Sequence, residues 1–211
     1  MLLKLKIYKH HLRKINDKDN MGWLRTSWYS LTQQLIRQDL LYYVLYVGLR
    51  PDKATNLVSY PYYCKYTVPG DSTFFRHIDL NISRLTIDNR GAEQIQGSVA
   101  LTDDDEKNCT KVIPQIHTHL SEWVERLNNR DIYPAGFVHR IKPEHFTPAD
   151  AQYFNTNWTA VPYSAGDVRI TMPYLPHGST GPASIERLTV LLWFVKIQPD
   201  REILELAEAG I

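Results

Sequence analysis

The chain has 211 residues and a net charge of +1 at neutral pH, with 43% hydrophobic and 22% charged residues. These values are typical of one globular domain and do not indicate nucleic acid or an anionic membrane as a partner. The longest apolar run, Leu40 to Leu49, is too short to span a bilayer, and the start of the chain lacks the apolar segment of a signal peptide. Two cysteines, Cys64 and Cys109, cannot form a disulfide framework, so we expect a reducing, cytoplasmic setting.

Residues 1–55 are predicted to form a mostly helical leader whose first, basic residues are solvated. Over residues 23–47, four leucines recur at near-helical spacing, and a glycine and a proline follow as stop signals: Leu31, Leu35, Leu41, Leu45, Gly48 and Pro51. This pattern predicts that residues 23–47 are helical.

From Asn56 the pattern changes to short β-type runs that are separated by Gly, Pro and Asp. The predicted strands are 57–68, 74–82, 93–102, 110–113, 156–162, 167–172 and 186–197. In 93–102, apolar residues alternate with polar ones, so one face of that strand should be buried. The run 186–197 is apolar on both faces, which indicates a fully buried strand.

One helix is predicted within the β region, at residues 117–130, where Leu120, Trp123, Val124 and Leu127 form an apolar stripe. Residues 131–155 contain three prolines and are expected to form a long loop, and residues 200–211 can form a short helix. Many short strands and few helices predict a single, mainly β domain, a sandwich or barrel with a core at 56–199.

The segment FFRHIDLNI places His77 and Asp79 two residues apart. On a strand, side chains at this spacing point to the same face. An imidazole and a carboxylate side by side can occupy adjacent positions on an octahedral metal, and a third ligand would complete the facial triad that suits Fe(II) and oxygen chemistry. A lone His-x-Asp pair is a weak signal, because a chain with eight histidines and many aspartates is expected to contain such a pair by chance.

The segment AGDVRITMPYLPHGSTGP supplies the further features, with His177 followed by Gly178, and Arg187 at the start of the last apolar strand. A guanidinium at the mouth of an apolar strand requires an anionic partner. A dicarboxylate could be that partner, with Thr189 on the same strand face adding a hydrogen bond. The alternative is a salt bridge to Glu186 or to an upstream acid.

These segments together resemble the Fe(II)/2-oxoglutarate-dependent dioxygenases, and within them the phytanoyl-CoA dioxygenase-like branch. The resemblance runs from about Tyr60 to Ile197 and is carried by FRHID, IQGSVALTDDDEKNCTKVIP, GDVRITMPYLPHGS and the RLT strand. The family often has Pro-Gly before the histidine of its helix, whereas this chain has Pro114-Gln115. The first 55 residues show no resemblance.

The resemblance implies a double-stranded β-helix (a cupin-like jelly roll) with flanking α-helices. It implies iron held by His77, Asp79 and His177, and 2-oxoglutarate bound through Arg187 and Thr189. The implied cofactor is Fe(II) and the co-substrates are 2-oxoglutarate and O2. The implied reaction is oxidation, by hydroxylation or another route, of a small organic substrate with release of succinate and CO2.

Two further residues, Tyr66 and Gln96, are predicted to reach the co-substrate from their strands. The acidic run at 103–106 is interpreted as a solvated turn, and His117 and His119 as surface or capping residues. Two other functions remain open: a catalytically silent binding or regulatory protein on the same fold, and a cupin-like metal enzyme that does not use 2-oxoglutarate. The substrate and the oligomeric state are not readable from the sequence.

Overall fold

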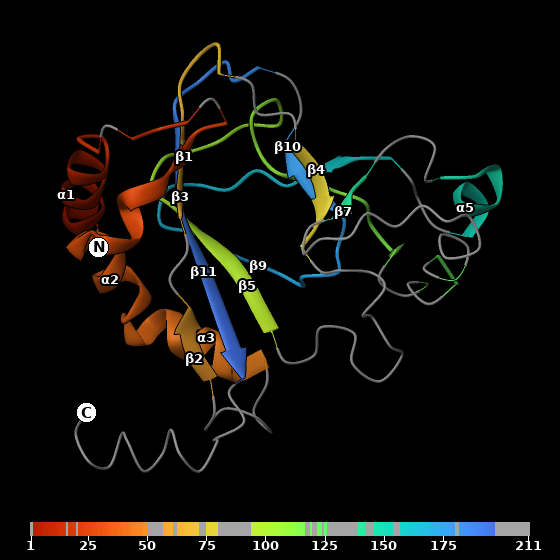
Figure 1. Ribbon diagram of the computed structural model, residues 1–211, viewed down its shortest axis with the longest axis horizontal. Helices are drawn as coiled ribbons and strands as arrows, with labels where there is room; N and C mark the ends of the chain where they lie inside the picture. The colour runs from red at the N-terminus through yellow and green to blue at the C-terminus, as the bar shows by residue number, and fades with distance from the viewer. Residues whose placement is uncertain are drawn as a thin grey trace.

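The computed structural model in Figure 1 describes most of the chain. The described residues are 2–15, 17–19, 21–49, 57–60, 63–71, 75–79, 94–116, 119, 122–123, 125, 139–141, 146–153, 157–179 and 182–196. Within these ranges the strands form two antiparallel sheets, here called the large sheet and the small sheet.

The large sheet is built around β11, the long apolar run predicted to be a buried strand. Its neighbours follow the order β1-β3-β11-β5-β9, and β2 pairs with the far end of β11. The bounds are β1 Trp23–Leu24, β2 Leu57–Tyr60, β3 Cys64–Thr67, β5 Gln94–Ala100, β9 Val168–Thr171 and β11 Arg187–Lys196. Each of these lies within a predicted strand except β1.

The small sheet follows the order β7-β4-β10-β6-β8. Its strands are short: β4 Phe75–Ile78, β6 Lys111–Val112, β7 His139–Arg140, β8 Thr159–Ala160 and β10 His177–Ser179. In Figure 1, β4, β10 and β7 lie to the right of β11, on the side away from α1 and α2. Two antiparallel sheets with flanking helices are the predicted double-stranded β-helix.

Each sheet has an apolar core on the face that points away from the other sheet. The core of the large sheet lies under α1 (Leu2–Leu12) and α2 (Leu31–Arg37) and consists of Leu12, Leu24, Ile36, Cys64, Ile95, Val99, Leu101, Leu188, Val190 and Leu192. The core of the small sheet consists of Ile78, Ile113, Ile116, Trp123 and Ile141. The alternation in the strand sequences assigns these apolar residues to the outer faces, so the polar residues between them face the space between the sheets.

The segment 23–47, predicted to be helical, is mostly helical but is divided into separate elements. The segment begins with β1, continues as a 3-10 helix at Arg25–Tyr29, and then forms two helices, α2 and α3 (Leu40–Leu49). The break is made by local caps, because Ser30 Oγ accepts from the Gln33 N–H and Asp39 Oδ1 accepts from the Leu41 N–H. The predicted leucine stripe is exposed, whereas α2 buries Thr32, Gln33 and Ile36.

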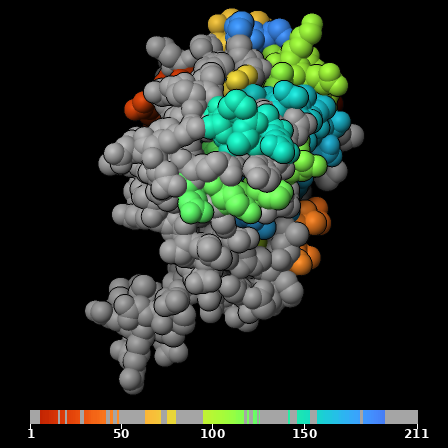
Figure 2. Space-filling model, turned by 90° about the vertical axis from the view of Figure 1, so that its right-hand side faces the viewer, coloured from red at the N-terminus to blue at the C-terminus, as the bar shows by residue number. Residues whose placement is uncertain are grey.

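The expected loop at 131–155 contains ordered elements, namely β7 and the short helix α5 (Pro148–Tyr153). Figure 2 shows the face of the molecule that carries α5, which in Figure 1 lies beyond β7 on the side away from α1. Trp123, from the predicted helix at 117–130, is buried and stacks on Phe146 with ring centroids 5.6 Å apart. The rest of that helix is mostly outside the described residues, and the predicted helix at 200–211 lies wholly outside them.

Gln115 adopts φ 66°, in the left-handed region that glycine adopts most easily. This is the position at which the chain departs from the Pro-Gly of the resembling family. No helix within the described ranges is both long and apolar enough to cross a bilayer.

Candidate functional site

The pairing of β4 with β10 brings two distant histidines together. His77 and His177 are direct partners in this antiparallel register, so their side chains project to the same side of the small sheet. Their ring centroids are 4.3 Å apart. The approach depends on Gly178, because a Cβ there would lie 2.0 Å from the Phe75 carbonyl oxygen.

Asp79, one residue beyond the end of β4, contacts both imidazoles. His77 Nε2 lies 3.0 Å from Asp79 Oδ1, and His177 Nε2 lies 3.2 Å from Asp79 Oδ2. The Asp79 backbone N–H donates to the Pro173 carbonyl oxygen at 3.0 Å, which fixes the position of the carboxylate. The predicted three residues therefore form one compact group, with one candidate ligand atom from each within 4.8 Å of the others.

The orientation of the rings fits a cation. His177 Nδ1 lies 2.9 Å from the Leu175 carbonyl oxygen, and His77 Nδ1 lies 3.4 Å from that of Phe75. A ring whose Nδ1–H donates to a carbonyl leaves Nε2 as a lone-pair acceptor. Each Nε2 would then face a carboxylate oxygen that is also an acceptor, and a positive ion between them removes that conflict.

The distances also fit. Two ligand atoms about 2.1 Å from an ion and at right angles to each other are about 3.0 Å apart. The contacts of His77 Nε2 with Asp79 Oδ1 at 3.0 Å and of His177 Nε2 with Asp79 Oδ2 at 3.2 Å are each close to this separation, so the three side chains are near enough to share one ion. The donor set of two imidazoles and one carboxylate suits iron.

The surroundings keep Asp79 ionised. Burial by itself would raise the pKa of Asp79, but His177 and His77 lower it well below its usual value. The pKa of His77 is lowered by burial and by the neighbouring His177. Gln96 Nε2 donates to Asp79 Oδ2 at 2.7 Å from β5 in the opposite sheet. The group is therefore an ionised carboxylate between two imidazoles, a ligand set that could hold a metal ion.

A cavity of about 420 Å³ lies between the two sheets and opens from this group. The large sheet lines it with side chains from the face opposite its apolar core, and the segment that includes Met21 and Trp23 lines it as well. Gln96 and Thr189, both predicted to reach a co-substrate, are among the lining residues. A space of this size is within the range for small-molecule sites.

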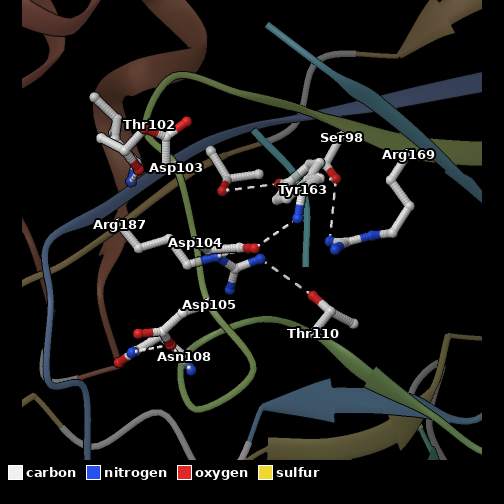
Figure 3. Close-up of polar contacts among 12 residues, drawn as sticks. Ser98, Thr102, Asp103, Asp104, Asp105, Asn108, Thr110, Tyr163, Arg169 and Arg187 are labelled. Atoms are coloured by element: carbon white, nitrogen blue, oxygen red, sulfur yellow. Dashed lines mark hydrogen bonds and ion pairs between the residues drawn. The ribbon is translucent and has the colours of Figure 1, made fainter. Parts of the chain in front are cut away.

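Arg187 also lines this cavity, six residues along β11 from Trp193, the register partner of Gln96, and its side chain is only 7% exposed. Its Nη2 donates to Thr110 Oγ1 at 3.1 Å, and its Nε lies 3.2 Å from Asp104 Oδ2 without hydrogen-bond alignment. Figure 3 shows this arrangement. The upstream acid considered as an alternative partner is thus present, but it does not use all the guanidinium donors, and Arg187 still lines the cavity.

A chain of hydroxyls continues from Arg187 across the large sheet. Tyr163 Oη lies 3.2 Å from Thr189 Oγ1 and 3.3 Å from Ser98 Oγ, and Arg169 Nη2 donates to Ser98 Oγ at 3.1 Å. Burial would raise the pKa of Tyr163, but Arg187 and Arg169 lower it. This end of the cavity is therefore cationic and rich in hydrogen-bond donors.

The prediction for Tyr66 is wrong. Its ring packs against the core of the large sheet, and its hydroxyl lies 3.1 Å from Glu186 Oε1 rather than in the cavity. Alternation along β3 places its neighbour Lys65 in the cavity instead. Burial lowers the pKa of Lys65 to about 7, with the Arg187 charge as a second cause. The Lys65 Nζ lies 5.2 Å from the ring centroid of Trp23.

The solvated-turn interpretation of residues 103–106 holds for its exposed members but is wrong for Asp104, whose side chain is 0% exposed. Sequence reasoning also missed Arg169 and Lys65. The signal that marked Arg187, a cation within an apolar strand, was present for Arg169 in the run VRIT. These residues line the cavity because their strand face points toward it, and the sequence does not tell which face that is.

A family model described as phytanoyl-CoA dioxygenase (PhyH) matches residues 8–185, most of the chain. The match begins well before Tyr60, so the leader, which showed no resemblance in the sequence alone, is largely part of the family pattern. No curated protein sequence matches the chain.

Solved structures share the fold at low sequence identity. EvdMO1 is 17% identical with a TM-score of 0.62 and aligns with 94% of this chain and 44% of its own. The epimerase SnoN, in complex with Fe3+, alpha ketoglutarate and nogalamycin RO, is 14% identical with a TM-score of 0.62 over 92% of this chain and 74% of its own. HygX from Streptomyces hygroscopicus, with nickel and 2-oxoglutarate bound, is 14% identical with a TM-score of 0.59 over 94% and 80%. The chain thus spans less than half the length of EvdMO1.

Proposed function

The chain belongs to the phytanoyl-CoA dioxygenase family, and from that premise we propose that it is an Fe(II)- and 2-oxoglutarate-dependent oxygenase. It hydroxylates, or otherwise oxidises, a small organic molecule and releases succinate and CO2. The observation that carries this proposal is the group of His77, Asp79 and His177, in which one candidate ligand atom from each residue lies within 4.8 Å of the others.

In this proposal the three residues would hold the iron beside the cavity. Iron bound there supplies the oxygen activation and the oxidising power of the reaction. The backbone carbonyls of Phe75 and Leu175 orient the two imidazoles, and Gln96 holds Asp79.

Arg187 and Thr189 bind the carboxylate of 2-oxoglutarate that lies away from the metal. Arg187 is fixed by Thr110 and Asp104, and Thr189 by the Tyr163 hydroxyl. Side chains that are fixed before the co-substrate arrives lose little conformational freedom on binding. The remaining wall of the cavity, which includes Met21, Trp23 and Trp193, excludes water and accepts the organic substrate.

The cytoplasm is the compartment that we propose for this activity. Cys64 and Cys109 are both buried free thiols. Thiols persist in a reducing environment, and an Fe(II) site is best kept in its reduced state there.

The test is an anaerobic titration with Fe(II) and then 2-oxoglutarate, followed by the visible metal-to-ligand charge-transfer band. Wild type is expected to develop the band, and His77→Ala to lack it, with His119→Ala as the control that retains it. Addition of O2 should then yield succinate. A wild-type protein with no band at saturation would indicate a binding protein on this fold instead, and Arg187→Ala with full turnover would indicate a cupin-like enzyme that does not need 2-oxoglutarate.

A further inference from the structure

Arg169 is a guanidinium on the inner face of the large sheet whose donors are mostly unused. Its Nη2 donates to Ser98 Oγ at 3.1 Å, and its guanidinium carbon lies 4.5 Å from the ring centroid of Tyr163. Its Nη1 is enclosed and has no hydrogen-bond partner among the described residues. An enclosed guanidinium nitrogen without a hydrogen-bond partner is costly to keep unless a further acceptor satisfies it.

The charges around Arg169 do not balance. Arg169 and Arg187 are close enough that Arg187 adds to the burial that lowers the pKa of Arg169. The carboxylate of Asp104 is the acid that faces them, and it lies 3.2 Å from Arg187 Nε. Two guanidiniums against one carboxylate leave an excess of positive charge in an enclosed space.

Both arginines line the same cavity, together with the hydroxyl-bearing residues Ser98, Thr110 and Thr189. In Figure 3 the guanidinium groups of Arg169 and Arg187 reach from opposite sides toward the region around Tyr163. A carboxylate has two oxygens and about four acceptor sites, so it can accept from two guanidiniums at once.

We propose that Arg169 is a second anchor for the distal carboxylate of the co-substrate, so that Arg187 and Arg169 form a two-guanidinium subsite that selects 2-oxo diacids over 2-oxo monoacids. This inference rests on the proposed function for the identity of the co-substrate. Arg169 is a binding and specificity residue here, and it does not act on the metal.

The experiment compares two ligands that chelate a metal identically and differ at the far end. 2-Oxoglutarate carries the distal carboxylate, and 2-oxopentanoate replaces it with a methyl group. Each is titrated anaerobically into the Fe(II) protein, with the charge-transfer band as the measure of binding. The variants are Arg169→Gln, which retains a donor for Ser98, Arg169→Lys, which retains the charge, and Lys107→Gln, an exposed control with the same change in net charge.

Loss of one charge-assisted contact should weaken 2-oxoglutarate binding by about 10- to 100-fold in Arg169→Gln. Binding of 2-oxopentanoate should change by less than about threefold, since its methyl group makes no such contact. Arg169→Lys should lie between, because an ammonium retains charge without the planar fork. Lys107→Gln should bind both ligands as wild type does.

Equal binding of 2-oxoglutarate by wild type and Arg169→Gln would overturn the proposal and leave Arg169 as a packing residue for Tyr163. An equal loss for both ligands would overturn it too, since the effect would then be on cavity shape. Near-ultraviolet circular dichroism identifies a variant that fails to fold, and Arg169→Lys then decides the question.

Calorimetric titration with glutarate, a diacid that lacks the keto group, separates this inference from the proposed function. If wild type shows no charge-transfer band but binds glutarate through Arg169, the anion subsite stands and the oxygenase proposal fails. If the band forms and glutarate binding is unaffected by Arg169→Gln, the oxygenase proposal stands and the subsite is wrong. If neither is seen, both are wrong.

Discussion

The two ends of the cavity differ in the charge of the ligand that they can hold. At the histidine end, Nε2 of His77 and Nε2 of His177 lie 3.0 and 3.2 Å from the carboxylate oxygens of Asp79, and this donor set can hold a cation. At the arginine end, Arg187 and Arg169 share one carboxylate, that of Asp104, and the group needs an anion. A small molecule that chelates a metal and ends in a carboxylate satisfies both ends.

The largest expected effect is at the histidine end. Asp79→Ala removes the negative charge and one of three ligand atoms, so Fe(II) affinity should fall by more than about 100-fold, beyond the range for outer-shell changes. Metal retained on dialysis against a chelator measures this, with Glu106→Gln as the exposed acidic control. Unchanged metal content in Asp79→Ala would show that the ion binds elsewhere.

At the arginine end, substitution should lower both the stability of the protein and the binding of 2-oxoglutarate. Arg187→Met removes the main anchor and leaves the Asp104 carboxylate enclosed without its guanidinium, so the free energy of unfolding should fall by about 1–3 kcal/mol at pH 7. Adding Asp104→Asn should restore most of that stability but not the binding of 2-oxoglutarate. Urea denaturation and ligand titration of the single and double variants give the two readings. If the double variant is no more stable than Arg187→Met, the Asp104 contact has no energetic role.

A smaller effect on metal affinity is expected at Gln96, which contacts Asp79 from the large sheet. Gln96→Leu removes the 2.7 Å hydrogen bond to Asp79 Oδ2 but retains all three ligand residues. Metal affinity should fall by about tenfold, as for other residues that orient a ligand. A chelator competition assay measures it, and Gln38→Leu, on the exposed end of α2, should have no effect. A Gln96→Leu protein with wild-type affinity would show that the Pro173 carbonyl contact alone positions Asp79.

The smallest effect concerns Lys65, whose pKa is about 7 in the folded protein and 10.5 for the same side chain in water. Between these values the unfolded chain carries a proton that the folded protein lacks, so stability should rise with pH above 7. Below pH 7 both states are protonated and the contribution is constant. Lys65→Met should flatten the rise, as followed by urea denaturation of the metal-free protein at pH 7, 8 and 9. Parallel pH profiles would show that Lys65 is solvated.

The strands of this protein were largely readable from the sequence, since alternation in residues 93–102 and the apolar run 186–197 correspond to β5 and β11. The helical character of 23–47 was readable too, but its division into separate helices was not, because the leucine spacing crosses two caps, Ser30 and Asp39. Spacing reports a local preference, and a cap changes the chain direction within one residue.

The ligand triad was predicted through a combination of motifs and a resemblance, and the structure brings its members together. The cavity residues Arg169 and Lys65 were not predicted, and the reason is physical. The sequence determines which residues alternate on a strand, so it placed Tyr66 and Lys65 on opposite faces without indicating which face meets the cavity. Sheet pairing decided that, since the register of β10 against β4 sets His177 beside His77, and the packing of the two sheets directs Arg169, Arg187 and Lys65 inward.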